Sequence, residues 1–356
     1  MSLLLVVIQQ PCAIRQFITA DWNCLMQEVR DQKLGARLGW LWQDQGLLDS
    51  CPGSVRNELM ARRFLPEFIQ AQTRFELRKL RKALASSAAP ILLLKGAAYM
   101  VSQLPLARGR TFSDLDVLVP RERLDEVENL LRTKGWETKN LEPYDQRYYR
   151  RWMHEIPPLR HKERNIEIDI HHAILPLTSR LQPSSDLLWD DSQLVADSNL
   201  RVLSPRDMVL HAAAHCFHDG EIKGALSQVI DIHELLLDFG VEDGFWPALL
   251  ERAEQLQLGR PLYYALTTSS ALLGTPVPSV VQREARRFAP NPVTDYMMQR
   301  LLRSGLEPRW PARREAYLAA WLLYVRSHWL RMPPGLLGAH LGRKAWRRAL
   351  SPPTNA

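Results

Sequence analysis

The sequence has few cysteines and no long apolar run. Its 356 residues contain four cysteines, and their spacing matches neither a metal-binding pair nor a disulfide framework. This usage fits a reducing compartment, so we expect a cytoplasmic protein. The longest apolar run near the start, Leu3–Ile8, is too short to span a bilayer and has no basic residues before it. We therefore expect no transmembrane segment and no signal peptide.

Internal repeats and low-complexity blocks are also missing, which argues against solenoid and fibrous architectures. The apolar fraction of 46% and the charged fraction of 24% are ordinary for a globular protein. At this length, the chain has room for two or three domains with sizeable cores.

Acidic residues are almost missing from the C-terminal segment. Residues 309–356 contain nine Lys or Arg against the single acid Glu315, so this segment accounts for the net charge of +7. Tryptophans and tyrosines are interleaved with these basic residues. The pattern is compatible with a phosphate-backbone contact, with a membrane-surface helix, or with an ordinary helix whose arginines are solvated. We expect Tyr317–Trp329 to pack, and the part from Gly335 onward to contact an anionic partner.

Two acidic residues, Asp114 and Asp116, stand at the start of a short apolar run that ends at Pro120. The run predicts a buried strand, and because side chains alternate along a strand, both acids should project from one face. Paired acids at the edge of a core repel each other and are tolerable when cations lie between them. The pair indicates a site for a hard divalent cation such as Mg²⁺, and a pair of solvated loop acids is the alternative. Neutralising Asp116 should relieve the repulsion and leave the fold intact or more stable.

Segments on either side of this pair predict its partners. Upstream, residues 91–94 predict a buried strand, followed by a Lys95-Gly96 turn and a helix start whose N–H groups would face an anion. We expect Gly96 to let the backbone turn sharply or approach a ligand closely, where nucleotide phosphates would lie. Downstream, residues 165–174 alternate between apolar and polar, which predicts a strand with Asp169 and His171 on one face. Asp169 is then a third acid able to meet the first two.

The order of these segments resembles the DNA polymerase β-like nucleotidyltransferase superfamily and, within it, the bacterial group called uncharacterised nucleotidyltransferases. That group has a Leu-Lys-Gly turn, an arginine shortly before Asp-x-Asp-x-Leu-Val, and an Asp-Leu-His strand. The matching residues are Leu94-Lys95-Gly96, Arg110, Asp114–Val119 and Asp169-Ile170-His171. The superfamily's turn is usually Gly-Gly or Gly-Ser, whereas Lys95-Gly96-Ala97 offers no hydroxyl.

The resemblance implies an α+β fold with a polymerase β-like core, a small mixed sheet with helices, flanked by helical N- and C-terminal regions. It implies a Mg²⁺-dependent enzyme, with Mn²⁺ as the alternative ion, that moves an NMP unit from an NTP to an acceptor hydroxyl and releases pyrophosphate. The predicted catalytic and metal-binding residues are Asp114, Asp116 and Asp169. The predicted nucleotide-binding residues are Lys95, Gly96, Arg110 and His171.

The acceptor stays open between a small molecule, a protein and an RNA. One alternative function is an RNA-directed nucleotidyltransferase or toxin-like enzyme that grips its acceptor through the basic tail. The other is a non-catalytic scaffold that binds nucleotide.

Apolar periodicity divides the chain into a helical N-terminal region at 1–87, a catalytic core at 88–180, a helical C-terminal domain at 181–332 and a basic tail at 333–356. Helical spacing from Glu58 to Ala85 is interrupted only at Pro66. In the core, a helix at 121–134 is followed by extended segments up to Ile174. Ser204 and Pro205 predict a helix start, as N-cap and first helical residue.

Three histidines, His211, His215 and His218, fall at helical spacing. They could bind zinc, although buried or cleft-lining histidines are the simpler explanation. Asp231 is the acid expected to orient one of these imidazoles.

Overall fold

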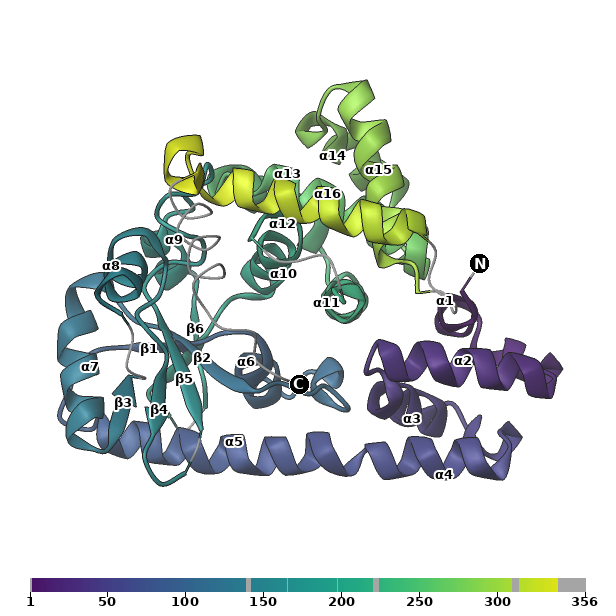
Figure 1. Ribbon diagram of the computed structural model, residues 1–356, viewed down its shortest axis with the longest axis horizontal. Helices are drawn as coiled ribbons and strands as arrows, with labels where there is room; N and C mark the ends of the chain where they lie inside the picture. The colour runs from purple at the N-terminus through teal and green to yellow at the C-terminus, as the bar shows by residue number, and fades with distance from the viewer. Residues whose placement is uncertain are drawn as a thin grey trace, which may run out of the picture.

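A seven-stranded mixed sheet lies in the left part of the molecule as Figure 1 shows it, with helices packed around it. The computed structural model describes residues 2–138, 142–164, 166–196, 198–219, 224–308 and 314–338. The strand order is β3-β4-β5-β2-β1-β7-β6, with β2 parallel to β5, β1 parallel to β7, and the other neighbours antiparallel. The α+β class expected from the sequence is confirmed. The strands are β1 Ile91–Leu93, β2 Asp114–Leu118, β3 Trp136–Thr138, β4 Leu159–His161, β5 Glu167–His171, β6 Gln193–Leu194 and β7 Leu200–Val202.

The described helices lie on both sides of the sheet and beyond its edge. Figure 1 shows α5 running beneath the sheet towards the N-terminal helices, while α10 to α13 and α16 lie on the opposite side. The α-helices are α1 Leu3–Gln9, α2 Thr19–Asp31, α3 Gly35–Asp44, α4 Gly53–Arg62, α5 Phe64–Ala83, α6 Lys95–Val101, α7 Leu124–Thr133, α8 Pro143–Trp152, α9 Ser185–Asp190, α10 Pro205–Ala214, α11 Leu226–Phe239, α12 Phe245–Gln255, α13 Gly259–Leu273, α14 Ser279–Ala285, α15 Pro292–Leu306 and α16 Arg314–Arg331.

Strands β2 and β5 separate an apolar face from a polar one. Leu115 and Val117 of β2 lie opposite Ile168 and Ile170 of β5, and all four are buried. Removing these aliphatic side chains from water stabilises the sheet by roughly 1.5–3 kcal/mol for each residue. The alternation leaves the acidic residues of both strands on the other face, as the sequence predicts.

Two predicted boundaries are wrong. The break between α4 and α5 falls at Arg63 and not at Pro66, which lies in the first turn of α5. A proline is tolerated there because the first N–H groups of a helix have no partner within the helix. Residues 143–152 form α8 where extended chain was expected, and Pro143 occupies the first helical position. The helix start at Ser204 is confirmed, since its side chain accepts from the Asp207 N–H.

The sheet continues past residue 180, because β7 pairs with β1. The domain boundaries stay predictions. Within the described residues, none of the helices combines the length and apolar character that crossing a bilayer requires.

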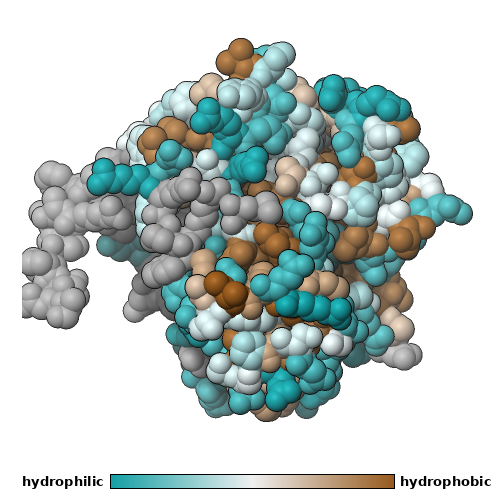
Figure 2. Space-filling view, turned by 90° about the vertical axis from the view of Figure 1, so that its right-hand side faces the viewer, coloured by the Kyte–Doolittle hydropathy of each residue, from teal (hydrophilic) through white to brown (hydrophobic). Residues whose placement is uncertain are grey.

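The described part of the C-terminal segment packs on one side only. Helix α16 buries Ala319 and Leu323, whereas the side chains of Tyr317 and Trp321 are 62% and 59% exposed. The packing expected for Tyr317–Trp329 therefore holds for one face of the helix. Figure 2 views the molecule from the right-hand side of Figure 1. On the face that it shows, hydrophilic residues separate the apolar patches from one another. Most of the basic tail, from residue 339 onward, lies outside the described residues.

Candidate metal and nucleotide site

The three acids predicted to bind metal lie together on the polar face of the sheet. Asp114 and Asp116 belong to β2 and Asp169 to β5, and the parallel register pairs Asp116 with Asp169. One carboxylate oxygen from each residue lies within 4.8 Å of the others. The convergence follows from the two-residue period of two adjacent strands. We call these three residues the acidic centre.

The acidic centre carries negative charge that its neighbours do not fully compensate. Burial, with Asp116 beside it, raises the pKa of Asp114. Burial, together with the carboxylates of Glu155 and Asp116, raises the pKa of Asp169 to about 7. The Oδ1 atom of Asp169 is buried and has no hydrogen-bond partner among the described residues. A divalent cation would supply both the missing charge and the missing contact, and an all-oxygen donor set suits Mg²⁺ or Mn²⁺.

Asp116 differs from the other two acids because basic side chains hold its Oδ1 atom. The Nζ atom of Lys95 donates to it at 2.9 Å, and the Nε2 atom of His171 lies at 3.0 Å. Burial alone would raise the pKa of Asp116, but Lys95 and His171 hold it well below its usual range. The expectation that neutralising Asp116 stabilises the fold is therefore wrong. Relief of repulsion is expected at Asp114 and Asp169 instead.

The turn before the acids is strained at Lys95 and not at Gly96. Lys95 has a φ of 46°, in the left-handed region, which costs a residue with a side chain roughly 1–3 kcal/mol. At Gly96, a Cβ atom would lie 2.5 Å from Nη1 of Arg110 and 2.6 Å from Cδ1 of Phe112. The predicted role of Gly96 in the sharp turn is thus wrong. Its missing side chain instead makes room for Arg110 and Phe112.

Arg110 is anchored away from the acids by Asp231 of α11. Its Nε atom donates to Oδ2 of Asp231 at 3.0 Å, and its guanidinium lies 5.5 Å from the centre of the Tyr99 ring. Arg37 of α3 donates to the other oxygen of Asp231. Since both carboxylate oxygens accept from arginines, the expectation that Asp231 orients an imidazole is wrong. We call Arg37, Arg110 and Asp231 the arginine cluster.

The pKa values of the three histidines at helical spacing, His211, His215 and His218, are all lowered by burial. Burial, with Lys95 nearby, lowers the pKa of His211 to about 3 and also lowers the pKa of His215. The Nε2 atom of His218 lies 2.7 Å from the hydroxyl of Ser179. Within the described ranges, the side-chain groups with metal-ligand spacing include none of these three histidines. The burial of His211 and His218 is in keeping with the simpler explanation.

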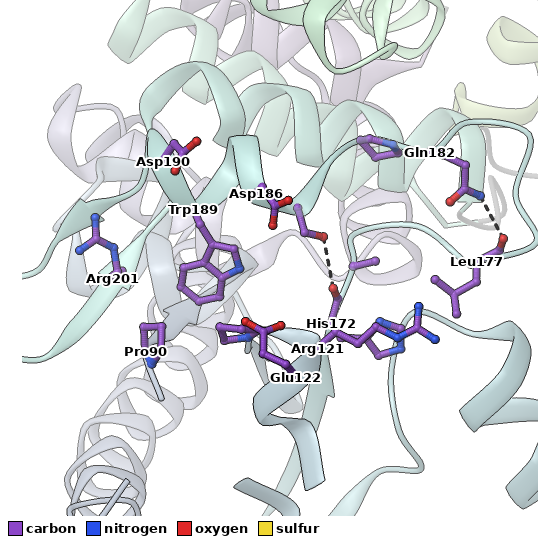
Figure 3. A pocket seen from close by; sticks show the side chains of 14 residues that line it. Pro90, Arg121, Glu122, His172, Leu177, Gln182, Asp186, Trp189, Asp190 and Arg201 are labelled. Atoms are coloured by element: carbon purple, nitrogen blue, oxygen red, sulfur yellow. Dashed lines mark hydrogen bonds between the residues drawn. The ribbon is translucent and has the colours of Figure 1, made fainter. Parts of the chain in front are cut away.

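A separate cavity of about 680 Å³ opens where β2 and β5 end (Figure 3). Asp186 and Trp189 of α9 face Arg121 and Glu122, which precede α7, and His172 lies between these groups. Its volume suits a small molecule. Its lining includes none of the three acids, so the cavity is not part of the acidic centre.

Comparison with known families agrees with the geometry. A family model described as uncharacterised nucleotidyltransferase matches residues 19–274, which is more than half of the chain. The chain belongs to this family. It is therefore an enzyme of the nucleotidyltransferase type. The matched range contains the acidic centre, the Lys95-Gly96 turn and the whole arginine cluster. No curated protein matches, and no solved structure matches.

Proposed function

We propose that the protein transfers an NMP unit from an NTP to an acceptor hydroxyl, with release of pyrophosphate, in a reaction that depends on Mg²⁺ or Mn²⁺. The observation that carries this proposal is the spacing of the acidic centre, in which carboxylate oxygens from two adjacent strands lie within 4.8 Å of one another. The polymerase β-like core is part of the same proposal. Both are supported by the order of the motifs along β1, β2 and β5.

In this proposal Asp114, Asp116 and Asp169 hold divalent cations, which supply positive charge at the entering and leaving oxygens of the α-phosphoryl group. The acceptor oxygen forms the new bond to the α-phosphorus, and the bond from that phosphorus to the pyrophosphate oxygen breaks. Lys95 and His171 keep Asp116 ionised and fix its Oδ1 atom. Besides holding a cation, Asp169 would help to remove the proton of the acceptor hydroxyl.

Nucleotide binding is proposed for Lys95, Gly96, Arg110 and His171. Lys95 is the cation beside the acids, and α6 begins at Lys95, so its first N–H groups suit a phosphate. Arg110 contributes through its Nη1 atom, which is buried near Gly96 with no hydrogen-bond partner in the described part of the chain.

The test is transfer of label from each of the four NTPs, carried at the α-phosphate, with Mg²⁺ and with small-molecule, protein and RNA acceptors. Asp116→Asn should lower transfer about 100-fold or more, since metal-ion catalysis supplies several kcal/mol and each 1.36 kcal/mol is tenfold in rate. Asp186→Asn is the matched control, because Asp186 lines the separate cavity and is exposed. Wild-type transfer by Asp116→Asn would refute the assignment.

The two alternatives give different results in the same assay. An RNA-directed enzyme would label RNA alone, with binding that weakens steeply as salt rises. A non-catalytic scaffold would gain thermal stability from Mg²⁺ and NTP, because a ligand that binds only the folded state raises the melting temperature, but it would transfer no label.

A further inference from the structure

Beside the acidic centre lies a second group of metal-ligand type, made of His154, Glu155 and His171. One ligand atom from each of these residues lies within 4.8 Å of the others. The backbone holds them in place: Glu155 bridges to His171 in antiparallel fashion, and the His172 N–H donates to the His154 carbonyl at 2.8 Å. The segment carrying His154 and Glu155 is thus fixed alongside the end of β5.

Each of the two imidazole rings has a buried nitrogen atom that makes no hydrogen bond within the described residues. His154 is 8% exposed and His171 is 3% exposed. The Nδ1 atom of each ring is buried and lacks a hydrogen-bond partner among the residues described. Leaving a buried polar atom unpaired costs about 1–3 kcal/mol. The Nδ1 atom of His171 lies 3.5 Å from Oε2 of Glu155, and one ring nitrogen of His154 lies within 4.8 Å of both residues' ligand atoms.

The other nitrogen of His171 is arranged as in a metal-bound histidine. Its Nε2 atom lies 3.0 Å from Oδ1 of Asp116, which fits an Nε2–H donor, so a metal ion would take the place of a proton on Nδ1. A histidine that binds a metal through one nitrogen commonly donates the other N–H to a carboxylate, which fixes the tautomer and the ring orientation.

We propose that His154, Glu155 and His171 form a binding site for a borderline-soft divalent cation, Zn²⁺, separate from the Mg²⁺ site of the acidic centre. Imidazole nitrogen suits Zn²⁺, whereas a set of carboxylate oxygens suits Mg²⁺ or Mn²⁺. Two histidines and one glutamate leave a coordination position open, as in zinc sites that also bind a water molecule or a substrate group. The His171–Asp116 hydrogen bond joins the two sites.

Binding requires a modest rearrangement of the two rings. Their centres are 5.1 Å apart and their planes differ by 27°, so in this stacked arrangement the lone pairs do not meet at one point. Rotation about the Cβ–Cγ bond of histidine has broad minima, so turning His154 is inexpensive. The ring of His171 is held by Asp116, and His154 is therefore the ligand that moves.

The test is a Zn²⁺ titration of the full-length protein after chelation and dialysis, by calorimetry in millimolar Mg²⁺. Wild type should bind one Zn²⁺ that Mg²⁺ does not displace. His154→Asn and Glu155→Gln should each weaken this binding by about 100-fold or more, since loss of outer contacts alone costs about 10–100-fold. His172→Asn is the matched control, because His172 is a buried histidine directly after β5 whose side chain lines the separate cavity. It should bind Zn²⁺ as wild type does.

The result separates this site from the proposed transfer function. Asp169→Asn should keep the Zn²⁺ affinity of wild type, because Asp169 belongs to the acidic centre and not to the group of His154, Glu155 and His171. In wild type, Co²⁺ bound in place of Zn²⁺ should show the visible spectrum of a site with nitrogen ligands. Absence of Zn²⁺ binding by wild type, unchanged affinity in both His154→Asn and Glu155→Gln, or loss of Zn²⁺ binding in Asp169→Asn would overturn the proposal. If Glu155→Gln alone stays folded, its affinity decides the outcome.

Discussion

The acidic centre and the arginine cluster both bury charge near the Lys95-Gly96 turn, but they balance it differently. In the arginine cluster, Arg37 and Arg110 donate to the two oxygens of Asp231, and their charges hold its pKa below the usual range although burial would raise it. In the acidic centre, the side chains of Lys95 and His171 make their hydrogen bonds to Asp116. The pKa values of Asp114 and Asp169 are raised instead.

The difference separates a structural ion pair from a site prepared for a ligand. A carboxylate whose oxygens both accept charge-assisted hydrogen bonds is complete within the protein. A carboxylate with an unpaired buried oxygen and a raised pKa destabilises the folded protein. Such a carboxylate is typical of a functional site, where a bound cation or substrate supplies the missing contact. On this basis, Asp231 links α3, the loop before β2 and α11 through Arg37 and Arg110, whereas the acidic centre is the proposed site for divalent cations.

Breaking the arginine cluster should give the largest effect on stability. Arg37→Met removes one partner of a buried ion pair, which typically lowers the free energy of unfolding by about 3–5 kcal/mol. Arg56→Met is the control, because Arg56 and Asp49 form an ion pair whose side chains are 46% and 92% exposed, and exposed pairs contribute about 0–1 kcal/mol. Urea unfolding measures both. Equal losses in the two variants would show that the cluster is not a structural ion pair.

A side chain at Gly96 should disturb the packing of the Lys95-Gly96 turn against Arg110 of the arginine cluster. In Gly96→Ala the new Cβ atom would meet Arg110 and Phe112 at 2.5 and 2.6 Å, and such overpacking typically costs about 1–3 kcal/mol. Gly53→Ala is the control, since nothing lies within 4 Å of a Cβ atom there. It should change the free energy of unfolding by less than about 1 kcal/mol. Thermal unfolding of both variants checks the difference, and a fully stable Gly96→Ala would mean that Arg110 and Phe112 move freely.

The smallest effect is a pH dependence that belongs to Asp169 in the metal-free protein. Its folded pKa is about 7, whereas an unfolded aspartate titrates near pH 3.9. Between these values the folded state keeps a proton that the unfolded chain releases. The group therefore favours folding most below the unfolded pKa, and this contribution is lost as the pH rises through the folded pKa.

Asp169→Asn lacks this contribution. In the presence of a chelator, wild type should therefore be more stable relative to Asp169→Asn at pH 5 than at pH 8. Urea unfolding at both pH values provides the measurement. A stability difference that is the same at pH 5 and pH 8 would contradict the raised pKa.

The acidic centre could be predicted from the sequence because its geometry is local. Asp114 and Asp116 share a face through strand alternation, and Asp169 needs only the pairing of one further strand to join them. The arginine cluster could not be predicted, because Arg37 and Asp231 are 194 residues apart and their meeting depends on how two helices pack. No local pattern in α3 or α11 sets that contact.

The role of Gly96 could not be read from the sequence either, since the motif shows that a glycine stands in the turn but not which neighbour needs the space. The positive φ of Lys95 occurs together with its tertiary hydrogen bond to Asp116. The grouping of His154 with Glu155 and His171 could not be predicted from the sequence, because the segment after α8 meets β5 only in the folded protein. Its nearness to His171 in space has no counterpart in spacing along the chain.

The central claim is that the acidic centre binds divalent cations, and a Mn²⁺ titration of the chelator-treated protein tests it most directly. Free Mn²⁺ is followed by electron paramagnetic resonance at pH 8, with and without NTP. Wild type should bind Mn²⁺, and more tightly with NTP present. The double variant Asp114→Asn and Asp169→Asn should remain folded and lose this binding, while Asp186→Asn should retain it. Mn²⁺ binding by the folded double variant with the affinity of wild type would contradict the account.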